Sequence, residues 1–561
     1  MSARAFTECF DLLLLALSFL ETDPLALASC ALVNSTFHQA ASRLLYNRVV
    51  HAPRVMDLRP SPWGRILPPA QILSAMTPRY ADLVHSLEIG RFLPKKAHGI
   101  RKQLEECFAA FRNLQHVALI PIVAREDVFW NVIPLLPKLQ YLKRLEINRL
   151  SHSVVELAVP EASTSSTYPA PLPMPQRYAM AILMEEGEEE EEGVVGTDHS
   201  KAESVPAEPA PEAQVTQEAS ALHHLEALTI HAPSRAVLDA LPAWLSKLSG
   251  TLRELHLLGD CGSITPGVLT SLSKSLRDVT AFSLGLSYSL TDAAIFDALA
   301  TFPDLADVHL AYYLQLNSPA HFPRLANLRK FAVDHPRFET ADAARRFSTW
   351  VRKAIRGTSR MEILRLSCSK EHDEPLLAAC DNHSVDGLAS HVSAKHAHSL
   401  RILDFGAATH VSKQMVEQIC KSCTRLEELR LCLSKDSLDV VRTYVASLPY
   451  LHTTAFQIKN SVILTLYNIE HTRTPEFLCA KYLRPPRGSP ESLKTSLVMP
   501  EAILYEGRRG RLRWISVNDI FWESLWRVDN DGEMRYFVAG PRKLASKEVP
   551  QWRVIGESEG G

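Results

Sequence analysis

The chain has 561 residues, several times the length of an average domain, so it forms either several domains or one elongated array of repeats. Its 61 lysines and arginines against 63 aspartates and glutamates give a net charge of -2. This balance argues against a general nucleic-acid or membrane-surface binder, since both need a strongly positive surface. We therefore expect no nucleic-acid partner and no membrane partner.

The cysteines and the N-terminal leucine run indicate the cellular compartment in which the protein is expected. Ten cysteines in a chain of this length indicate thiols packed in a reducing environment rather than a disulfide framework. The leucine run follows the acidic residues Glu8 and Asp11 and is interrupted by Glu21, so it lacks the flank of a signal peptide and the ~18 apolar residues of a membrane span. We expect a soluble protein of the cytoplasm, the nucleus or both.

Residues 6–50 are predicted to form three short helices. Leucines spaced at i, i+4 and i+7 place an apolar stripe on the first helix. Asp23 followed by Pro24 is a cap and a first-turn proline that start the second helix, and Ser35 or Thr36 caps the third. Three helices of this length bury too little surface to be stable alone, so they should dock onto a further surface.

The sequence of these helices closely resembles the F-box, particularly as it is written in fungal F-box proteins. The segments that carry the resemblance are Leu12 to Leu20, Asp23 to Leu27, Cys30 to Asn34, Phe37-His38 and Leu44 to Val49, with Glu8-Cys9 where the family commonly begins with Leu-Pro. The resemblance implies docking onto the Skp-type adaptor of a cullin-based SCF ubiquitin ligase. It also implies a set of residues that divides between the adaptor interface and the small helical core: Leu12, Leu13, Leu17, Leu20, Pro24, Leu25, Leu32, Val33, Phe37, Leu44 and Leu45.

Residues 80–460 repeat the phrase L-x-x-L-x-L in loose variants, from Val84-Leu87-Ile89 to Leu451-Thr454-Phe456. Most phrases follow one another at intervals of 25 to 30 residues, with helix-start signals between them such as Thr265-Pro266 and Thr291-Asp292. Each unit is therefore predicted to form a strand, a loop and a helix. Stacked units predict an α/β fold, a curved solenoid with parallel strands on the concave side and helices on the convex side. This span resembles leucine-rich-repeat proteins; a HEAT-like all-helical solenoid and a doubly wound sheet are the alternatives.

A long stretch without the phrase interrupts the array. Residues 151–220 are rich in Pro, Ala, Ser, Thr and Glu and include the acidic run from Glu185 to Glu192. Such a composition cannot bury enough apolar surface to fold, so it predicts a disordered acidic insertion within one repeat. A solvated spacer is favoured over a docking site for a basic partner.

In residues 461–561 the phrase disappears, so we expect the array to end there and a capping or accessory region to follow. Trp522 and Trp526 lie four residues apart and are expected to share a helix face. Two strands are expected on either side of Asp531-Gly532, because Asp-Gly is a common hairpin turn.

One residue in each phrase is predicted to face the concave side, because side chains alternate along a strand and its two neighbours are apolar. These residues are Glu88, Ala118, Glu146, Thr229, His256, Ser283, His309, Ala332, Arg365, Asp404, Arg430 and Ala455. Their polar, mixed-sign character suits a protein partner, while a solvated sheet face is the equal alternative. We expect a protein substrate to contact His256, Ser283, His309, Arg365, Asp404 and Arg430.

The sequence contains no phosphate loop, G-x-G-x-x-G, H-E-x-x-H or G-x-S-x-G motif. Cys420 and Cys423 have C-x-x-C spacing without a second pair, which favours buried packing over a metal site. The histidines show no ligand spacing, and His396 is expected at a surface or loop position. We therefore expect no enzyme, no cofactor and no metal, but a substrate-recognition adaptor. The alternatives are a leucine-rich-repeat scaffold without a ligase role and an enzyme whose site is formed by distant residues of the C-terminal region.

Overall fold

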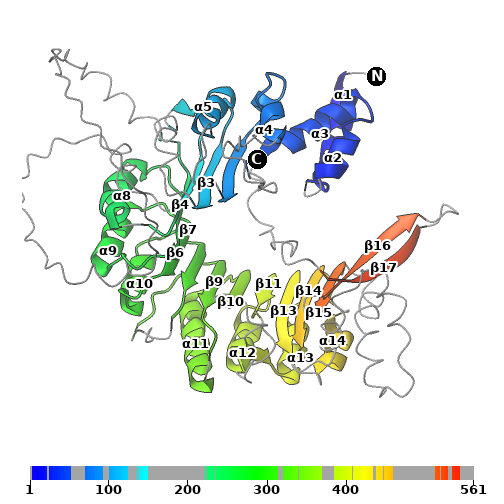
Figure 1. The fold of residues 1–561 in the computed structure, drawn as a ribbon. Helices are drawn as coiled ribbons and strands as arrows, with labels where there is room; N and C mark the ends of the chain where they lie inside the picture. The colour runs from blue at the N-terminus through cyan, green and yellow to red at the C-terminus, as the bar shows by residue number, and fades with distance from the viewer. Residues whose placement is uncertain are drawn as a thin grey trace, which may run out of the picture.

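The computed structural model describes residues 3–21, 24–51, 70–92, 100–123, 136, 138–148, 222, 224–233, 235–313, 319, 321–338, 340–368, 384–406, 409–433, 437–445, 448–458, 512–517, 520–528 and 534–543. Within them the chain forms an α/β, solenoid-like arch, with strands along its inner side and helices along its outer side (Figure 1). The predicted acidic insertion, residues 151–220, lies outside the described residues.

The chain begins with three helices, α1 (Ala3–Ser18), α2 (Pro24–Cys30) and α3 (Ser35–Asn47). Helix α2 starts at Pro24 as predicted, because proline has a helical φ and lacks only an N–H that the first turn leaves unbonded. The cap of α3 was predicted wrongly: it is Asn34, whose side chain accepts a hydrogen bond from the Phe37 N–H at 2.9 Å. Among the helices in the described ranges, leucine-rich α1 included, none is long and apolar enough to cross a membrane.

Helix α3 passes directly into a strand that the sequence pattern did not predict, β1 (Arg48–His51). It is followed by α4 (Ala70–Ala75), the short 3₁₀ helix η1 (Ala81–Leu83), β2 (Ser86–Phe92) and α5 (Ile100–Ala110). Strand β1 pairs in parallel with β2, where Val49 lies opposite Leu87 and both are fully buried. The three N-terminal helices are therefore joined to the sheet without a linker.

The central part of the chain is built from strands and helices in the predicted alternation. In chain order they are β3 (His116–Val123), β4 (Arg144–Asn148), β5 (Ala227–His231), α8 (Arg235–Leu248), β6 (Glu254–Asp260), α9 (Pro266–Ser275), β7 (Ala281–Leu286), α10 (Asp292–Leu299), β8 (Asp307–Ala311), β9 (Lys330–His335), α11 (Ala341–Ala354), the 3₁₀ helix η3 (Ile355–Gly357), β10 (Ile363–Cys368), α12 (Asp386–Lys395), β11 (Ile402–Asp404), β12 (His410–Val411), α13 (Lys413–Ser422), β13 (Glu428–Leu433), α14 (Leu438–Val445) and β14 (Thr453–Ile458). Each strand pairs in parallel with the strand before it, except that β11 and β12 both lie along β13. Because strand order follows the chain, both the all-helical and the doubly wound alternatives are excluded.

The core lies between the sheet and the outer helices. The register aligns the middle apolar residue of every phrase into one ladder, each member at most 2% exposed: Leu87, Val117, Leu145, Leu228, Leu255, Phe282, Val308, Phe331, Leu364, Leu403, Leu429 and Thr454. Helices α9 and α10 cover part of it and start at the predicted caps, Thr265 and Thr291. Since burying one such apolar side chain contributes about 1.5–3 kcal/mol, this ladder is a main source of the fold's stability.

Two predictions for the C-terminal region were wrong. The parallel array continues beyond residue 460, because β15 (Trp514–Val517) pairs in parallel with β14 and extends the buried ladder with Ile515. Trp522 and Trp526 lie in a strand, β16 (Ile520–Val528), and not on a helix. The two strands expected around residues 531–532 are confirmed as β16 and β17 (Met534–Lys543), which pair antiparallel, and β16 also pairs with β15.

Candidate interaction surfaces

The three N-terminal helices, called the helical unit from here on, have a small core of their own. It contains Phe10, Leu17, Leu27, Ala40 and Ala41, each at most 9% exposed. Five of the predicted adaptor-binding residues are partly buried against this core: Leu13, Leu20, Phe37, Leu44 and Leu45. These side chains, together with Leu17, hold the helical unit together, so a polar residue at position 17 would disturb its folding.

Six large apolar side chains of the helical unit are exposed to solvent, and we call them the apolar face. They are Leu12, Leu15, Phe19, Leu25, Leu32 and Val33, and each is 61 to 87% exposed. More than half of the exposed large apolar side chains among the described residues fall in this short stretch. Such a concentration makes this stretch the candidate interaction surface of the helical unit, because exposed apolar residues usually occur singly.

Four members of the apolar face, Leu12, Leu25, Leu32 and Val33, are among the predicted adaptor-binding residues, and Pro24 beside them is also exposed. Leu15 and Phe19 are not among the predicted residues. Leu15 belongs to the same leucine run as the buried Leu17, so the sequence alone does not show which of the two faces outward.

The twelve residues predicted to face the concave side lie in one row across the sheet, and we call them the concave row. Parallel pairing places His256, Ser283 and His309 on adjacent strands, and it places Arg365, Asp404 and Arg430 likewise. Their neighbours along each strand are members of the buried core, so the row points to the inner side of the arch (Figure 1). All six residues predicted to contact a substrate therefore lie on this row.

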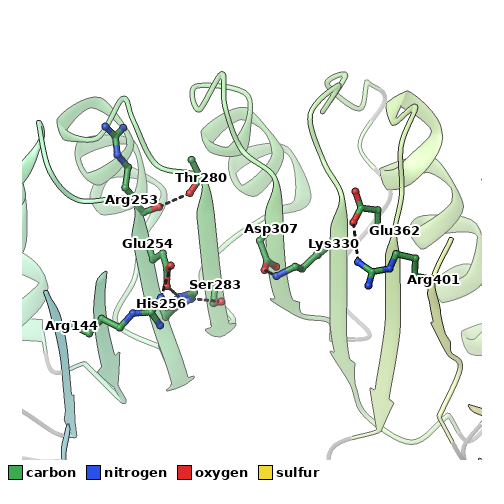
Figure 2. A network of polar contacts seen from close by, with 10 residues as sticks. All are labelled: Arg144, Arg253, Glu254, His256, Thr280, Ser283, Asp307, Lys330, Glu362 and Arg401. Atoms are coloured by element: carbon green, nitrogen blue, oxygen red, sulfur yellow. Dashed lines mark hydrogen bonds and ion pairs between the residues drawn. The ribbon is translucent and has the colours of Figure 1, made fainter. Parts of the chain in front are cut away.

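Ion pairs connect strands of the sheet near their amino ends, between adjacent strands or across one intervening strand (Figure 2). Arg144 on β4 reaches Glu254 on β6 at 3.1 Å, because only the small side chain of Ala227 stands between them. Arg401 contacts both carboxylate oxygens of Glu427, at 2.8 and 2.9 Å. Pairs whose side chains remain exposed contribute about 0–1 kcal/mol each, so they add little to the stability of the sheet.

Two histidines of the concave side pair with carboxylates. His231 Nε2 lies 2.6 Å from Glu146 Oε1, and this hydrogen bond holds the pKa of the glutamate below its usual value. His309 Nε2 lies 2.9 Å from Asp334 Oδ2. Burial opposes the charged form of His309, but the hydrogen bond and negative charge of Asp334 outweigh it, so the pKa of His309 is raised. This part of the face therefore gains positive charge readily as the pH falls.

Four charged residues of β10, β11 and β13 surround a cavity of about 10 Å³, which has room for about one water molecule. Arg365 lies 3.5 Å from Glu428, and Arg430 lies 3.8 Å from Asp404. Burial raises the pKa of both carboxyl groups although an arginine faces each of them. The buried Nε of Arg430 has no hydrogen-bond acceptor among the described residues, so the cluster retains a donor for a further group.

On the concave side, Ser283, His256 and Glu254 follow one another in the order of the serine, histidine and acid of a serine hydrolase. Ser283 Oγ lies 2.7 Å from His256 Nδ1, and Glu254 lies 3.6 Å from the Nε2 of the same ring (Figure 2). A nucleophilic serine needs access to substrate and N–H donors for the developing oxyanion. Ser283 is 5% exposed, and its strand is paired with β6 on one side and β8 on the other. The contact therefore orders the sheet surface and does not form a hydrolytic site.

Cys420 and Cys423 are buried, and burial raises the pKa of each thiol to about 12, so neither is poised as a metal ligand. Within the ranges that the structure describes, no group of three or more His, Cys, Asp or Glu side chains could hold a metal ion. His396 lies in the loop directly after α12, one of the two positions expected for it, but it is buried there: it is 1% exposed, and its two ring nitrogens have no hydrogen-bond partner among the described residues.

A polar groove of about 350 Å³ extends the concave side toward the helical unit. It is lined by Asn47, the last residue of α3, and by residues at the start of β2 to β5: His85, Ser86, Gln115, His116, Lys143, Arg144 and Glu226. The polar surface of the arch thus continues up to the helices that carry the apolar face.

Comparisons with known proteins do not identify the chain. No protein family matches it, and no curated protein matches it. One solved structure that matches is a structural-genomics target from Bacteroides fragilis, with 12% identity and a TM-score of 0.22. The alignment covers 44% of this chain and 64% of that one, so this chain spans less than two thirds of its length. No conclusion about function rests on this likeness.

Proposed function

We propose that this protein is a substrate-recognition adaptor of an SCF-type cullin ubiquitin ligase. In this proposal the helical unit is an F-box that docks a Skp-type adaptor, and through it a cullin. The arch is a leucine-rich-repeat solenoid that binds a protein substrate on its concave side. The protein catalyses no step itself; it raises the concentration of substrate lysines near a ubiquitin-charged enzyme.

The observation that carries the proposal is the apolar face. Phe19, Leu25 and Leu32 are each at least 80% exposed. Apolar surface gains about 25 cal/mol for each Å² that leaves water, so a partner that covers several such side chains gains substantial binding free energy. The core of the helical unit is small, and among the residues that the structure describes none covers these six side chains. A partner with an apolar helical surface fits this face.

The concave row supports the second half of the proposal. Its charges are mixed in sign, with Glu88 and Glu146 at one end and Arg365, Asp404 and Arg430 at the other, which opposes a polyanion and suits a protein surface of mixed charge. The cluster around Arg430 and the groove near Lys143 both offer polar groups to a bound chain. We propose that substrate specificity lies here, at the half-buried His256, His309, Arg365, Asp404 and Arg430, with the buried Ser283 holding the ring of His256 in place.

Co-purification tests this proposal. The full chain is co-expressed with a Skp-type adaptor and analysed by size-exclusion chromatography, alongside the double variant Leu25→Asp, Leu32→Asp. The control is Leu73→Asp on α4, which replaces a leucine that is 56% exposed and lies outside the apolar face. We expect the wild type and the control to co-elute with the adaptor, and the double variant to elute alone while its circular dichroism stays unchanged.

If the folded wild type elutes without the adaptor, the F-box proposal fails. The chain is then best explained as a leucine-rich-repeat scaffold without a ligase role. Leu17 is unsuited to this test, because it belongs to the core of the helical unit and its substitution would confuse unfolding with lost docking.

A further inference from the structure

A series of side-chain contacts connects the helical unit to the first strands of the sheet. Tyr46 of α3 stacks on Tyr80, with ring centroids 4.3 Å apart and planes at 15°, and its hydroxyl donates to Ser74 Oγ at 3.1 Å. His38 of α3 lies between two oxygens: its Nε2 is 3.1 Å from the Tyr80 hydroxyl, and its Nδ1 is 3.2 Å from the Ala31 carbonyl. The contacts therefore run from the end of α2, through α3, to the segment that precedes η1 and β2.

One tautomer of His38 satisfies both contacts at once. Its Nδ1–H donates to the carbonyl of Ala31, and its Nε2 accepts the hydroxyl proton of Tyr80. The ring of Tyr46 stacks on the face of the Tyr80 ring and restrains its position. Neither the ring of His38 nor the ring of Tyr80 can rotate without breaking a hydrogen bond or the stacking contact.

These contacts restrain a motion that the backbone alone would permit. Helix α3 ends at Asn47 and β1 begins at Arg48, so a single peptide link joins the helical unit to the sheet. Rotation about that link would swing the apolar face relative to the concave row. Tyr80 and Ser74 lie on the sheet side of the link, and their bonds to His38 and Tyr46 oppose such rotation.

We infer that His38 and Tyr80 are positioning residues that hold the apolar face and the concave row in one fixed relative orientation. The consequence for activity rests on the proposed function. In a receptor that binds an adaptor at one end and a substrate on its inner side, this orientation sets where the substrate lies relative to the bound adaptor.

A distance measurement on the full chain tests the inference. Nitroxide labels are attached through azide-bearing residues at two exposed sites, Gln39 on α3 and Asp239 on α8, and pulsed dipolar spectroscopy gives the distance distribution. We expect a single narrow peak for the wild type. We expect His38→Ala and Tyr80→Ala to lose that peak in favour of a broad distribution, because each removes a contact on the sheet side of α3.

Two further variants separate positioning from general damage. His38→Gln should restore the narrow peak, since an amide can donate to the Ala31 carbonyl and accept from the Tyr80 hydroxyl. Tyr141→Ala, which truncates a tyrosine that is 55% exposed and far from these contacts in sequence, should leave the peak unchanged. Circular dichroism on each sample confirms that the helices remain folded.

The outcomes of this test are distinct from those of the proposed function. A broad distribution in the wild type, or an unchanged peak in both His38→Ala and Tyr80→Ala, overturns the inference. Adaptor co-elution is measured on the same samples and should match the wild type, because the apolar face is intact in every variant. If the wild type fails to bind the adaptor but keeps its narrow peak, the proposed function falls and the positioning role stands.

Discussion

The helical unit and the parallel sheet use their apolar residues in opposite ways. The helical unit buries a core of five residues and exposes six large apolar side chains. The sheet buries a ladder that is apolar except for Thr454, while its concave row is mostly polar and ion pairs bridge the strands that carry it. The sheet therefore buries its apolar side chains within its own fold. The helical unit leaves apolar side chains in water, and a partner would stabilise it by covering them.

Under the proposed function, this difference would give the two regions different kinds of recognition. Burial of the apolar face supplies affinity with little demand on geometry, because the hydrophobic effect has no direction. The concave row, with charges already paired across strands, supplies little affinity but strong selection against partners whose charges do not match. One region would anchor a constant partner and the other would discriminate among variable ones.

The largest expected effect tests whether the sheet depends on its buried ladder. Phe331 on β9 is fully buried, and Phe331→Ala should lower the free energy of unfolding by about 3–5 kcal/mol. Urea unfolding followed by circular dichroism measures the loss, with Tyr141→Ala as the exposed aromatic control. A loss below about 1 kcal/mol would mean that the ladder does not hold the sheet together.

Acid should weaken the solenoid through His396. Burial, followed by the nearby charges of His391 and Lys395, lowers the pKa of His396 from 6.5 to about 4. The unfolded chain therefore binds the proton more tightly, so this histidine costs stability as the pH falls through 6.5 toward 4, by about 3 kcal/mol in total. We expect His396→Leu to remove that part of the acid dependence in urea titrations at pH 7 and pH 4.5. An equal acid loss in both proteins would contradict the assignment.

A smaller effect, an increase in stability, is expected when the polar residue in the buried ladder, Thr454, is replaced by an apolar one. Thr454 on β14 is 1% exposed, and its hydroxyl has no hydrogen-bond partner among the described residues. Thr454→Val keeps the shape and removes the buried hydroxyl, so it should stabilise the protein by about 1 kcal/mol. Thermal melting compares the variant with the wild type, and a lowered melting temperature would show that the hydroxyl is satisfied in solution.

The smallest effect concerns the ion pairs of the concave side. Arg401 and Glu427 form a two-contact pair, but the side chains remain 41% and 27% exposed. A double-mutant cycle with Arg401→Met and Glu427→Gln should give a coupling of about 0.2–1 kcal/mol, reduced further by added salt. A coupling of several kcal/mol would make the concave charges part of the structural framework and weaken the contrast with the helical unit.

The sequence predicted the repeated strands and the concave row well, because three apolar residues at fixed spacing determine both which residues are buried and which lie between them. It missed β15, although Leu512, Ile515 and Val517 have the same spacing. This phrase begins more than 50 residues after the preceding phrase, so the repeat interval of 25 to 30 residues did not predict a strand at this position. Trp522 and Trp526 were misassigned because a spacing of four places residues on one side of a strand as well as of a helix.

The apolar face was predicted only in part, for a physical reason. Helix α1 has leucines on several sides, so the pattern does not show whether Leu15 or Leu17 enters the core. That choice depends on how α1 packs against α3, which is a tertiary contact between separate segments. The hydrogen bonds of His38 and Tyr80 could not be predicted for the same reason, since 42 residues separate the two.

Hydrogen–deuterium exchange of the full chain, with and without a Skp-type adaptor, tests the central claim most directly. The adaptor should slow exchange in α1, in α2 and in the turns that follow each of them, which together carry the apolar face, and it should leave the strands of the concave row unchanged. Unaltered exchange in both helices at saturating adaptor, or slowing confined to the sheet, would contradict it.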